Sequence, residues 1–263
     1  SFCHAVRGLW YCVVANDSGR CFRLEKEKKE TVGVAMNIGI NASAVSGRKG
    51  GASFYIVNII RALLKMDQSN RYFIYSTPNN AIDFRDLPKR SRLRPTAPAS
   101  TLLRLMWEQT VLPFLICPTD GIDVLLSPNY TAPVFCPFSS SVVVIHDLSF
   151  YPLSNLYPRS RRLFKSAIAL SVSRADRVIA VSRCTKRDIV SYIGRYESKV
   201  DVVYEAADER FAGPASPAQV TALRSTYGIT RKYVLFVGFL EPRKNLERLL
   251  KAFAQIQTRI DHQ

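Results

Sequence analysis

From residue 36 onward, short apolar runs alternate with longer segments that have helical periodicity. Because these runs are apolar throughout rather than at every second position, they are typical of strands buried on both faces of a parallel sheet. Their alternation with helices predicts an α/β protein with a doubly wound parallel sheet. The predicted strands are 36–41, 71–76, 123–128, 141–147, 177–182, 200–205 and 233–239.

The predicted helices separate these strands. In the first helix, Phe54, Val57, Ile60 and Leu64 recur at steps of three or four residues and predict one buried stripe. Residues 77–99 are rich in proline and arginine, so we expect a loop there. The predicted helices are 51–66, 101–116, 158–173, a segment that ends near Ile193, 218–227 and 245–260.

Small residues and prolines interrupt this rhythm in the stretch AADERFAGPASPAQ, residues 206–219. We interpret residues 36–208 as an N-terminal domain, 209–219 as a linker and 220–263 as the start of a second α/β domain. One strand and two helices cannot enclose a core, because each must bury its apolar face against further elements. We therefore expect the chain to stop inside its second domain.

The N-terminal segment differs from the rest of the chain. It opens on Ser1, and residues 1–35 show no sustained helical or strand period. We interpret Met36 as the natural start and residues 1–35 as a non-native or disordered extension. A genuine extra segment is the alternative, whereas a secretory signal is disfavoured because no continuous apolar stretch precedes a cleavage site.

The charge balance is strongly basic, with a formal net charge of +16 over 263 residues. The first 35 residues hold six Lys/Arg and four Asp/Glu, so +14 remains without them. Such an excess suits a polyanionic partner, whether nucleic acid, an anionic membrane face or a phosphorylated small molecule, and charge alone does not choose among these. A solvated basic surface remains the simplest explanation of each run alone. The excess is concentrated in 89–95, 159–165 and 182–187.

The composition is that of a soluble globular protein, with 47% hydrophobic and 22% charged residues. No apolar run approaches the roughly 18–20 residues that cross a bilayer. Six cysteines are scattered without a CxxC pair or zinc-site spacing. We expect reduced thiols in a cytoplasmic protein.

Ligands of open parallel sheets collect beyond the carboxyl ends of the strands, so the residues after each predicted strand are candidates. Gly47, Gly50 and Gly51 form a flexible turn that leads into a helix N-terminus, where backbone N–H groups could meet an anion or a sugar. The pattern matches neither GxGxxG nor the P-loop. A glycine turn without a ligand explains it equally well.

His146 and Asp147 directly follow an apolar strand. An imidazole at a cleft edge can hydrogen-bond hydroxyl groups and titrates near physiological pH. A structural histidine is an equally good interpretation, and Asp147 either forms a turn or holds the imidazole. Ser182 follows the next strand, and a helix-capping role explains it without a ligand.

The stretch YVLFVGFLEPRKN, residues 233–245, places Gly238 at a strand end and then a Glu-Pro turn. Arg243 and Lys244 follow immediately before Asn245, which we expect to cap the next helix. Cations at a helix N-terminus are locally unfavourable because the helix dipole prefers anions there. A bound diphosphate would reverse this, since the helix amides and both side chains would share its charge.

With these motifs in order, the chain from about Met36 onward resembles the family-four retaining glycosyltransferases of GT-B fold, particularly the bacterial mannosyl- and rhamnosyltransferases of surface-polysaccharide assembly. Each motif is modest alone, and the ordered set of seven is specific for the family though not for donor or acceptor. The motifs lie at 38–64, 104–113, 123–133, 142–153, 175–189, 199–211 and 233–254.

The resemblance implies two Rossmann-like domains, the first handling the acceptor and the second binding a nucleotide-diphosphate sugar, with GDP-mannose the favoured donor. It implies transfer with retention and without a bound metal or other cofactor. Lys244 and Arg243 would stabilise the leaving diphosphate. His146 would orient the donor sugar, and the glycines Gly50, Gly51 and Gly238 would line the donor site.

The resemblance also implies a saccharide or polyprenyl-diphosphate-linked acceptor, and a cytoplasmic enzyme at the inner face of an anionic membrane. Two departures stand out. Phe239 occupies a position where many relatives carry arginine, and the family's paired glutamates would lie beyond Gln263. We therefore expect this fragment to be inactive alone. A non-catalytic sugar-nucleotide or polyanion binder is the alternative, and no motif for specific nucleic-acid recognition is present.

Overall fold

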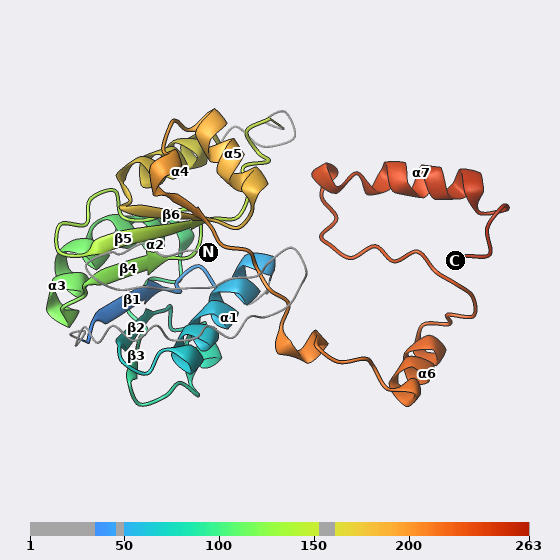
Figure 1. The fold of residues 1–263 in the computed structure, drawn as a ribbon, viewed down its shortest axis with the longest axis horizontal. Helices are drawn as coiled ribbons and strands as arrows, with labels where there is room; N and C mark the ends of the chain where they lie inside the picture. The colour runs from blue at the N-terminus through green and yellow to red at the C-terminus, as the bar shows by residue number, and fades with distance from the viewer. Residues whose placement is uncertain (1–34, 46–49, 153–160, 263) are drawn as a thin grey trace, which may run out of the picture. The chain divides into compact units, whose positions relative to one another are not determined.

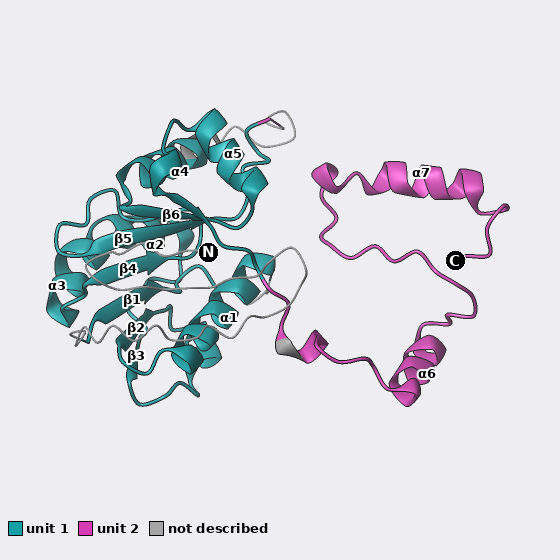
Figure 2. Cartoon of the chain, in the orientation of Figure 1, with its two compact units in different colours: residues 1–151, 160–205 teal, residues 152–159, 206–263 magenta. Residues whose placement is uncertain are grey.

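The computed structural model describes residues 35–45, 50–152 and 161–262 (Figure 1). The chain divides into two units, which are coloured separately in Figure 2. Unit 1 comprises residues 1–151 and 160–205, and unit 2 comprises residues 152–159 and 206–263. The interpretation of residues 1–34 as an extension, and the candidate Gly47, lie outside the described residues.

Unit 1 is built on a seven-stranded sheet in which every neighbouring pair is parallel. The strand order is β3-β2-β1-β4-β5-β6-β7, so the direction of winding reverses between β1 and β4. This arrangement confirms the predicted doubly wound α/β fold. The strands are β1 (Asn37–Asn41), β2 (Arg71–Tyr75), β3 (Ser91–Arg94), β4 (Val124–Ser127), β5 (Ser140–Ile145), β6 (Arg177–Ala180) and β7 (Val200–Val202).

Helices cover both faces of this sheet (Figure 1). In unit 1 the α-helices are α1 (Gly51–Met66), α2 (Thr101–Gln109), α3 (Cys117–Asp120), α4 (Arg161–Arg174) and α5 (Arg183–Tyr192). Shorter turns of 3₁₀-helix lie at η1 (Ala81–Phe84) and η4 (Glu197–Lys199), and η2 (Leu112–Ile116) is a π-helix. Unit 2 contains η5 (Glu209–Phe211), α6 (Pro217–Thr226), η6 (Pro242–Lys244) and α7 (Leu246–Ile256).

The core of unit 1 lies on both faces because alternate residues of β2 point in opposite directions. Tyr72 and Ile74 pack with Ile56 and Ile60 of α1 on one face, and all four are fully buried. Phe73 and Tyr75 pack on the other face, in the cluster that contains Trp107 and Leu112. Burial of each large aliphatic side chain contributes about 1.5–3 kcal/mol, so the two layers together stabilise the sheet.

The buried stripe of α1 differs by one position from the predicted one. Val57, Ile60 and Leu64 are buried as expected, but Phe54 is 45% exposed and Ser53 is buried instead. The buried face of α1 therefore begins at Ser53 and continues with residues that are three or four positions further along the helix each time. Phe54 lies one residue off this face, at its edge, because each residue turns the helix by about 100°.

Two other predictions in unit 1 were wrong. The predicted helix 101–116 is broken after Gln109, and a π-helical turn replaces its second half. Pro113 has no N–H group to donate to the preceding turn, which disfavours a continuous α-helix. The predicted loop 77–99 contains the edge strand β3, whose sequence SRLR has a single apolar residue. An edge strand pairs on one side only and commonly carries charged side chains, which hides it from a search for apolar runs.

Unit 2 has helices but no core of its own. The predicted strand 233–239 is not formed, and no described residue of this unit is buried. Leu235, Val237 and Leu240 are 70%, 81% and 82% exposed. A parallel strand needs a neighbour for its backbone hydrogen bonds, and within the described part of unit 2 only the isolated bridge between Lys232 and His262 supplies one.

Two expectations from composition can be compared with the described residues. None of the helices found there combines the length and the apolar character needed to cross a membrane. The described cysteines Cys117, Cys136 and Cys184 are free thiols.

Hydrogen exchange should separate the two units. We expect the backbone amides of β1, β4 and β5 to exchange slowly, because their strands are paired on both sides and buried. Amides of α6 and α7 should exchange faster by at least two orders of magnitude, because no described residue around them is buried. Peptide-resolved mass spectrometry checks this, and slow exchange in α7 would contradict it.

Candidate functional site

His146 follows the last residue of β5 at the carboxyl edge of the sheet. Its Nε2 lies 3.0 Å from the backbone oxygen of Pro128, and its Nδ1 lies 2.9 Å from Oε1 of Glu205. The imidazole is 12% exposed and the glutamate side chain 47%. Each ring nitrogen therefore lies within hydrogen-bonding distance of an oxygen atom, one from the backbone and one from a side chain.

Two tyrosines enclose the imidazole. Tyr55 of α1 meets it edge-on with 4.9 Å between ring centroids, and Tyr130 lies at 5.5 Å. Tyr130 has a φ of +60°, which side-chain-bearing residues seldom adopt, and its N–H donates to the backbone oxygen of Val144 at 2.9 Å. Backbone strain of this kind is retained where the surroundings hold it in place, and it concentrates at functional sites.

Burial raises the pKa of the Tyr55 phenol to about 12, and the nearby charge of Glu205 adds to this effect. Tyr55 therefore remains a neutral hydroxyl at physiological pH. The backbone oxygen of His146 accepts a hydrogen bond from Thr185 Oγ1 of α5 at 3.1 Å. Segments from α1, α5 and the ends of β4 and β5 thus meet around one imidazole.

Asp147 does not hold this imidazole. Its Oδ1 accepts hydrogen bonds from the backbone N–H of Ser149 at 3.1 Å and from the Ser149 hydroxyl at 2.9 Å, which closes a turn. Of the two roles considered for Asp147, the turn is the one found. Glu205 contacts the imidazole instead, and it escaped notice because we assigned residues 200–205 to a strand that ends at Val202.

The glycine turn before α1 lies at the same edge of the sheet. Gly50 occupies the N-cap position with φ −88° and ψ 179°, an extended conformation that other residues also adopt. A Cβ atom added at Gly51 would meet nothing within 4 Å. The backbone conformation therefore does not require a glycine at position 50, and crowding by the described residues does not require one at Gly51. Tyr55, one turn further along α1, contacts His146.

The third candidate stretch has structural roles. Ser182 caps α5, because its Oγ accepts the Thr185 N–H at 3.0 Å, as predicted. Lys186 Nζ donates to the backbone oxygen of Val200 at 2.8 Å. Arg187 lies 3.0 Å from Cys184 Sγ.

In unit 2, Arg243 and Lys244 form the 3₁₀ turn that immediately precedes α7. Arg243 Nε pairs with Glu241 Oε2 at 2.6 Å, so the positive charge before the helix is partly balanced. Lys244 is exposed, and its ammonium has no hydrogen bond or ion pair with the described residues. The unfavourable placement of cations before the helix is thus reduced at Arg243 by the ion pair with Glu241, and no described residue reduces it at Lys244.

Two backbone positions shape this turn. Asn245 occupies the N-cap position of α7 in the left-handed conformation with φ +53°, but its side chain makes no capping hydrogen bond, so the predicted capping interaction is absent. Gly238 has φ +158°, and a Cβ atom there would lie 3.4 Å from the Phe236 ring. A glycine is favoured at that angle because it has no side chain to strain.

A buried carboxylate that we had not singled out ties α2 to the carboxyl end of β1. Glu108 is 5% exposed, and its Oε2 accepts a hydrogen bond from Asn41 Nδ2 at 2.9 Å. Gln109 Nε2 donates to its other oxygen at 3.2 Å. Burial raises the pKa of the Glu108 carboxyl, against the opposing effect of these hydrogen bonds. A single carboxylate in a mainly apolar helix gave no sequence signal for a polar cluster.

A parallel sheet with this order, carrying polar side chains at its carboxyl edge, defines a Rossmann-like domain, and its structural neighbours have the GT-B fold. Solved structures with the same fold include Anabaena Alr3699/HepE in complex with UDP-glucose, at TM-score 0.60 and 20% identity over 84% of this chain and 57% of that one. The same protein with UDP and glucose superimposes with TM-score 0.59, over 84% and 58% of the two chains.

The chain belongs to Glycosyltransferase Family 4, which it matches over residues 49–211. It is 28% identical over 120 residues to the serotype-specific mannosyltransferase WbdA of Escherichia coli, covering 43% of this chain and 14% of that protein. It is 25% identical over 128 residues to the O-antigen chain mannosyltransferase B of Escherichia coli, covering 48% and 33%. The matched region thus spans a third or less of these curated relatives.

Glu108 predicts a pH-dependent difference in stability. The pKa of the Glu108 carboxyl is raised in the folded state, so the folded protein holds the carboxyl proton more tightly than the unfolded chain does. In the unfolded chain the pKa of a glutamate is about 4.3. The stability that this group contributes is full below that pH and is lost as the pH rises through the folded-state pKa. Glu108→Gln cannot ionise, so its free energy of unfolding should rise relative to wild type as the pH is raised from about 4.5 to 8, by about 1.4 kcal/mol per unit of pKa difference.

Urea unfolding at several pH values, followed by circular dichroism, measures this difference. Glu247→Gln is the matched control, because the Glu247 side chain is 80% exposed. A difference between Glu108→Gln and wild type that stays constant over the pH range would show that Glu108 carries no such penalty.

Proposed function

We propose that the protein acts as a hexosyltransferase that moves a sugar from a nucleotide-diphosphate donor to a saccharide or lipid-linked acceptor, with retention, in surface-glycan biosynthesis. The match to Glycosyltransferase Family 4 over residues 49–211 carries this proposal. GDP-mannose is the favoured donor, and the names of the two Escherichia coli mannosyltransferases support it. The bound UDP-glucose of the Anabaena protein supports a nucleotide-diphosphate sugar more generally.

In this proposal Lys244 neutralises the diphosphate as the bond between the sugar carbon and the phosphate oxygen breaks. Its ammonium is exposed at the start of α7 and has no ion-pair partner among the described residues, so it is available to an anion. The N-terminal amides of α7 add favourable polarity for the same charge. Arg243 would contribute less, because Glu241 already holds its Nε. The positive φ of Gly238 sets the backbone path just before this turn.

On the side of the sugar we assign an orienting role to His146. The imidazole is held by Pro128 and Glu205 and enclosed by Tyr55 and Tyr130, so its direction is fixed before a ligand arrives. Glu205 is half-exposed, which leaves this hydrogen-bonded pair accessible to a sugar hydroxyl. Gly50 and Gly51 would line the donor site near the same edge, and the open space around the Gly51 Cα is compatible with this role.

The chemical step needs no protein nucleophile in this scheme. The acceptor hydroxyl oxygen bonds to the sugar carbon on the face that the diphosphate leaves, and its proton passes to the departing phosphate oxygen. The protein cations stabilise the charge that develops, so we propose no metal requirement. We further propose that the enzyme works at the cytoplasmic face of an anionic membrane, where each well-placed Lys or Arg contributes about 1 kcal/mol of attraction.

The 263-residue chain should bind GDP-mannose weakly and should not turn it over, because the described residues of unit 2 form no buried core that could hold a nucleotide firmly. We expect a Kd above about 1 mM, equivalent to less than about 4 kcal/mol of binding free energy. Titration followed by NMR should move the amide signals of residues 238–247, and UDP-glucose should move them less. Release of GDP in a coupled assay checks for turnover.

Lys244→Ala should abolish these signal changes, whereas Lys251→Ala should preserve them. Lys251 is the matched control, because it lies on the same helix and pairs with Glu247 at 2.5 Å. Signal changes that persist in Lys244→Ala would contradict the role of Lys244. Measurable release of GDP by the 263-residue chain would contradict its expected inactivity.

A further inference from the structure

Unit 1 contains a second polar cavity that the proposed reaction does not use. Its volume is about 480 Å³. Asn37 and Arg71, the first residues of β1 and β2, line it together with residues of β3 and the end of α3. Because all strands are parallel, the starts of β1 and β2 lie at the edge of the sheet opposite to the one at which His146 follows β5. The lining residues are Asn37, Arg71, Phe73, Lys89, Arg90, Arg92, Arg94, Thr119 and Asp120.

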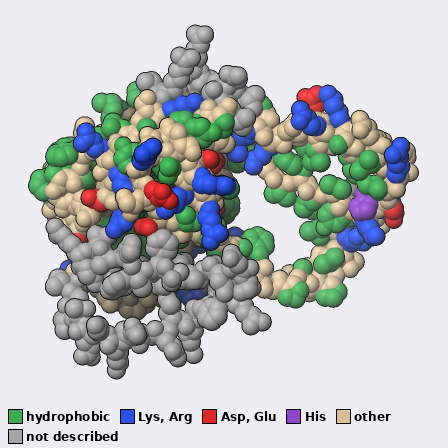
Figure 3. All heavy atoms as spheres, turned by 45° about the horizontal axis from the view of Figure 1, so that its top comes forward, with side chains coloured by type: hydrophobic (Ala, Val, Ile, Leu, Met, Phe, Trp, Pro, Cys, Tyr) green, Lys and Arg blue, Asp and Glu red, His purple; other side chains and the backbone are tan. Residues whose placement is uncertain are grey.

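The lining is strongly cationic. It contains five Lys and Arg side chains and one carboxylate, that of Asp120. This carboxylate is already engaged, because it pairs with Arg94 at 2.6 Å and accepts a hydrogen bond from the Tyr75 hydroxyl at 3.2 Å. On the face of unit 1 that Figure 3 shows, basic side chains lie among acidic and apolar ones. The lining of the cavity, by contrast, has five basic side chains for one carboxylate.

Several of these cations have unused donors. The side chains of Arg71 and Lys89 make no hydrogen bond or ion pair with the described residues. Arg90 donates one Nη to Gln68 at 2.7 Å, but the Nε atoms of Arg90 and Arg94 are buried without a hydrogen-bond partner in this part of the chain. A buried donor left unpaired costs about 1–3 kcal/mol, and an oxyanion is the acceptor that guanidinium groups match best.

The register of the sheet explains how the cluster forms. Arg92 and Arg94 are two residues apart on β3 and so point to the same face. They lie opposite Phe73 and Tyr75 of β2, and the Arg92 guanidinium is 6.0 Å from the centre of the Phe73 ring. Charged residues on an edge strand can simply prevent aggregation. That role requires neither a cavity nor buried unpaired Nε atoms, so it does not account for this arrangement.

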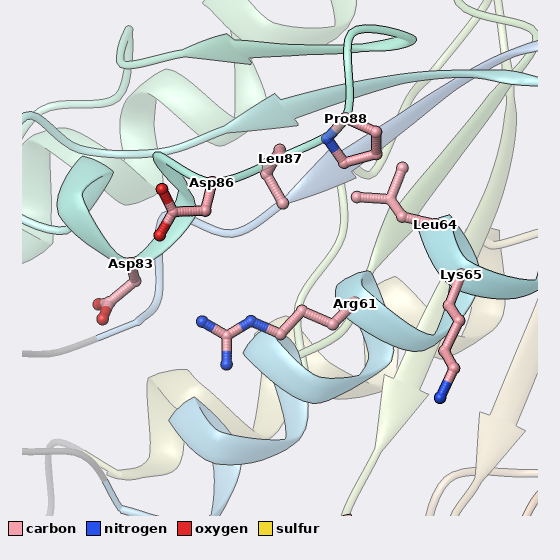
Figure 4. A pocket seen from close by; sticks show the side chains of 7 residues that line it. All are labelled: Arg61, Leu64, Lys65, Asp83, Asp86, Leu87 and Pro88. Atoms are coloured by element: carbon pink, nitrogen blue, oxygen red, sulfur yellow. The ribbon is translucent and has the colours of Figure 1, made fainter.

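Another cavity among the described residues of unit 1 provides a comparison. It measures about 290 Å³ and lies between the second half of α1 and the η1 region. Arg61 and Lys65 are balanced there by Asp83 and Asp86, and Figure 4 shows Arg61 extending between the helix and the two aspartates while Lys65 points away. A lining with equal numbers of cations and carboxylates selects no charge. Of these two cavities, the one lined by Arg71, Arg92 and Arg94 has a clear preference for an anion.

We propose that the cavity lined by Arg71, Arg92 and Arg94 is a binding site for a phosphate or diphosphate group, separate from the site around His146. Guanidinium groups bind phosphate oxygens in pairs, and a doubly charged ligand would relieve the mutual repulsion of the five cations. The group can belong to a lipid headgroup or to a soluble molecule. This inference concerns unit 1 alone and does not depend on the proposed transferase activity.

Inorganic pyrophosphate, titrated into the 263-residue chain and followed by residue-resolved NMR, tests the proposal. We expect the amide signals of β3 to shift with a Kd that weakens as salt is added, since screening reduces such attraction. The double variant Arg71→Gln/Arg92→Gln should weaken this Kd at least tenfold. The variant Arg61→Gln/Arg85→Gln removes the same charge elsewhere and should stay within twofold of wild type. Equal thermal unfolding midpoints confirm that the variants fold.

Vesicle sedimentation identifies the source of the phosphate. Binding to phosphatidylglycerol vesicles but not to phosphatidylcholine vesicles, lost in Arg71→Gln/Arg92→Gln, assigns it to a lipid headgroup. Pyrophosphate binding without vesicle binding assigns it to a soluble molecule. The proposal is wrong if neither ligand binds, or if binding is as strong in the double variant as in wild type. Lys244→Ala leaves this readout unchanged, so failure here is separate from failure of the donor site.

Discussion

The parallel direction of all seven strands is the constraint on which the rest of unit 1 depends. Parallel pairing requires a covered crossover between neighbouring strands, which places helices on both faces and buries the strands between them. It also brings every carboxyl end to one edge. His146, Tyr130 and Glu205 come from segments that are far apart in the sequence, and they meet because β4, β5 and β7 all end at that edge.

The same constraint gives the two edges different chemistry. At the carboxyl edge, an imidazole is enclosed by aromatic rings and hydrogen-bonded by a carboxylate and a carbonyl oxygen, which suits the recognition of hydroxyl groups. At the opposite edge, guanidinium groups from β2 and β3 surround a cavity with one engaged carboxylate. The described residues around His146 are mainly aromatic and polar, whereas those that line the cavity are mainly cationic. A single sheet thereby presents two distinct surfaces to two kinds of polar ligand.

The architecture of unit 1 was readable from the sequence where apolar runs were long. Helix α1 was found with both bounds, and six strands were located to within a few residues. Edge strand β3 was missed, because its sequence contains a single apolar residue and therefore no apolar run that would indicate a strand. The strand expected at 233–239 did not form, although its apolar run was among the clearest, because backbone pairing depends on neighbours that a local pattern does not contain. At the site, His146 was identified from its place after β5, whereas Glu205 and Glu108 became visible only when distant segments were brought together.

Glu205 is the last residue of unit 1, and Ala206 begins unit 2. The carboxylate that contacts Nδ1 of His146 thus belongs to the residue at which the chain passes from one unit to the next. One of the two hydrogen-bond partners of the imidazole is therefore placed by the backbone at the boundary between the units, and the other by the loop after β4. The residue to which we assign the orientation of the sugar thus depends on the exact point at which the chain leaves the sheet.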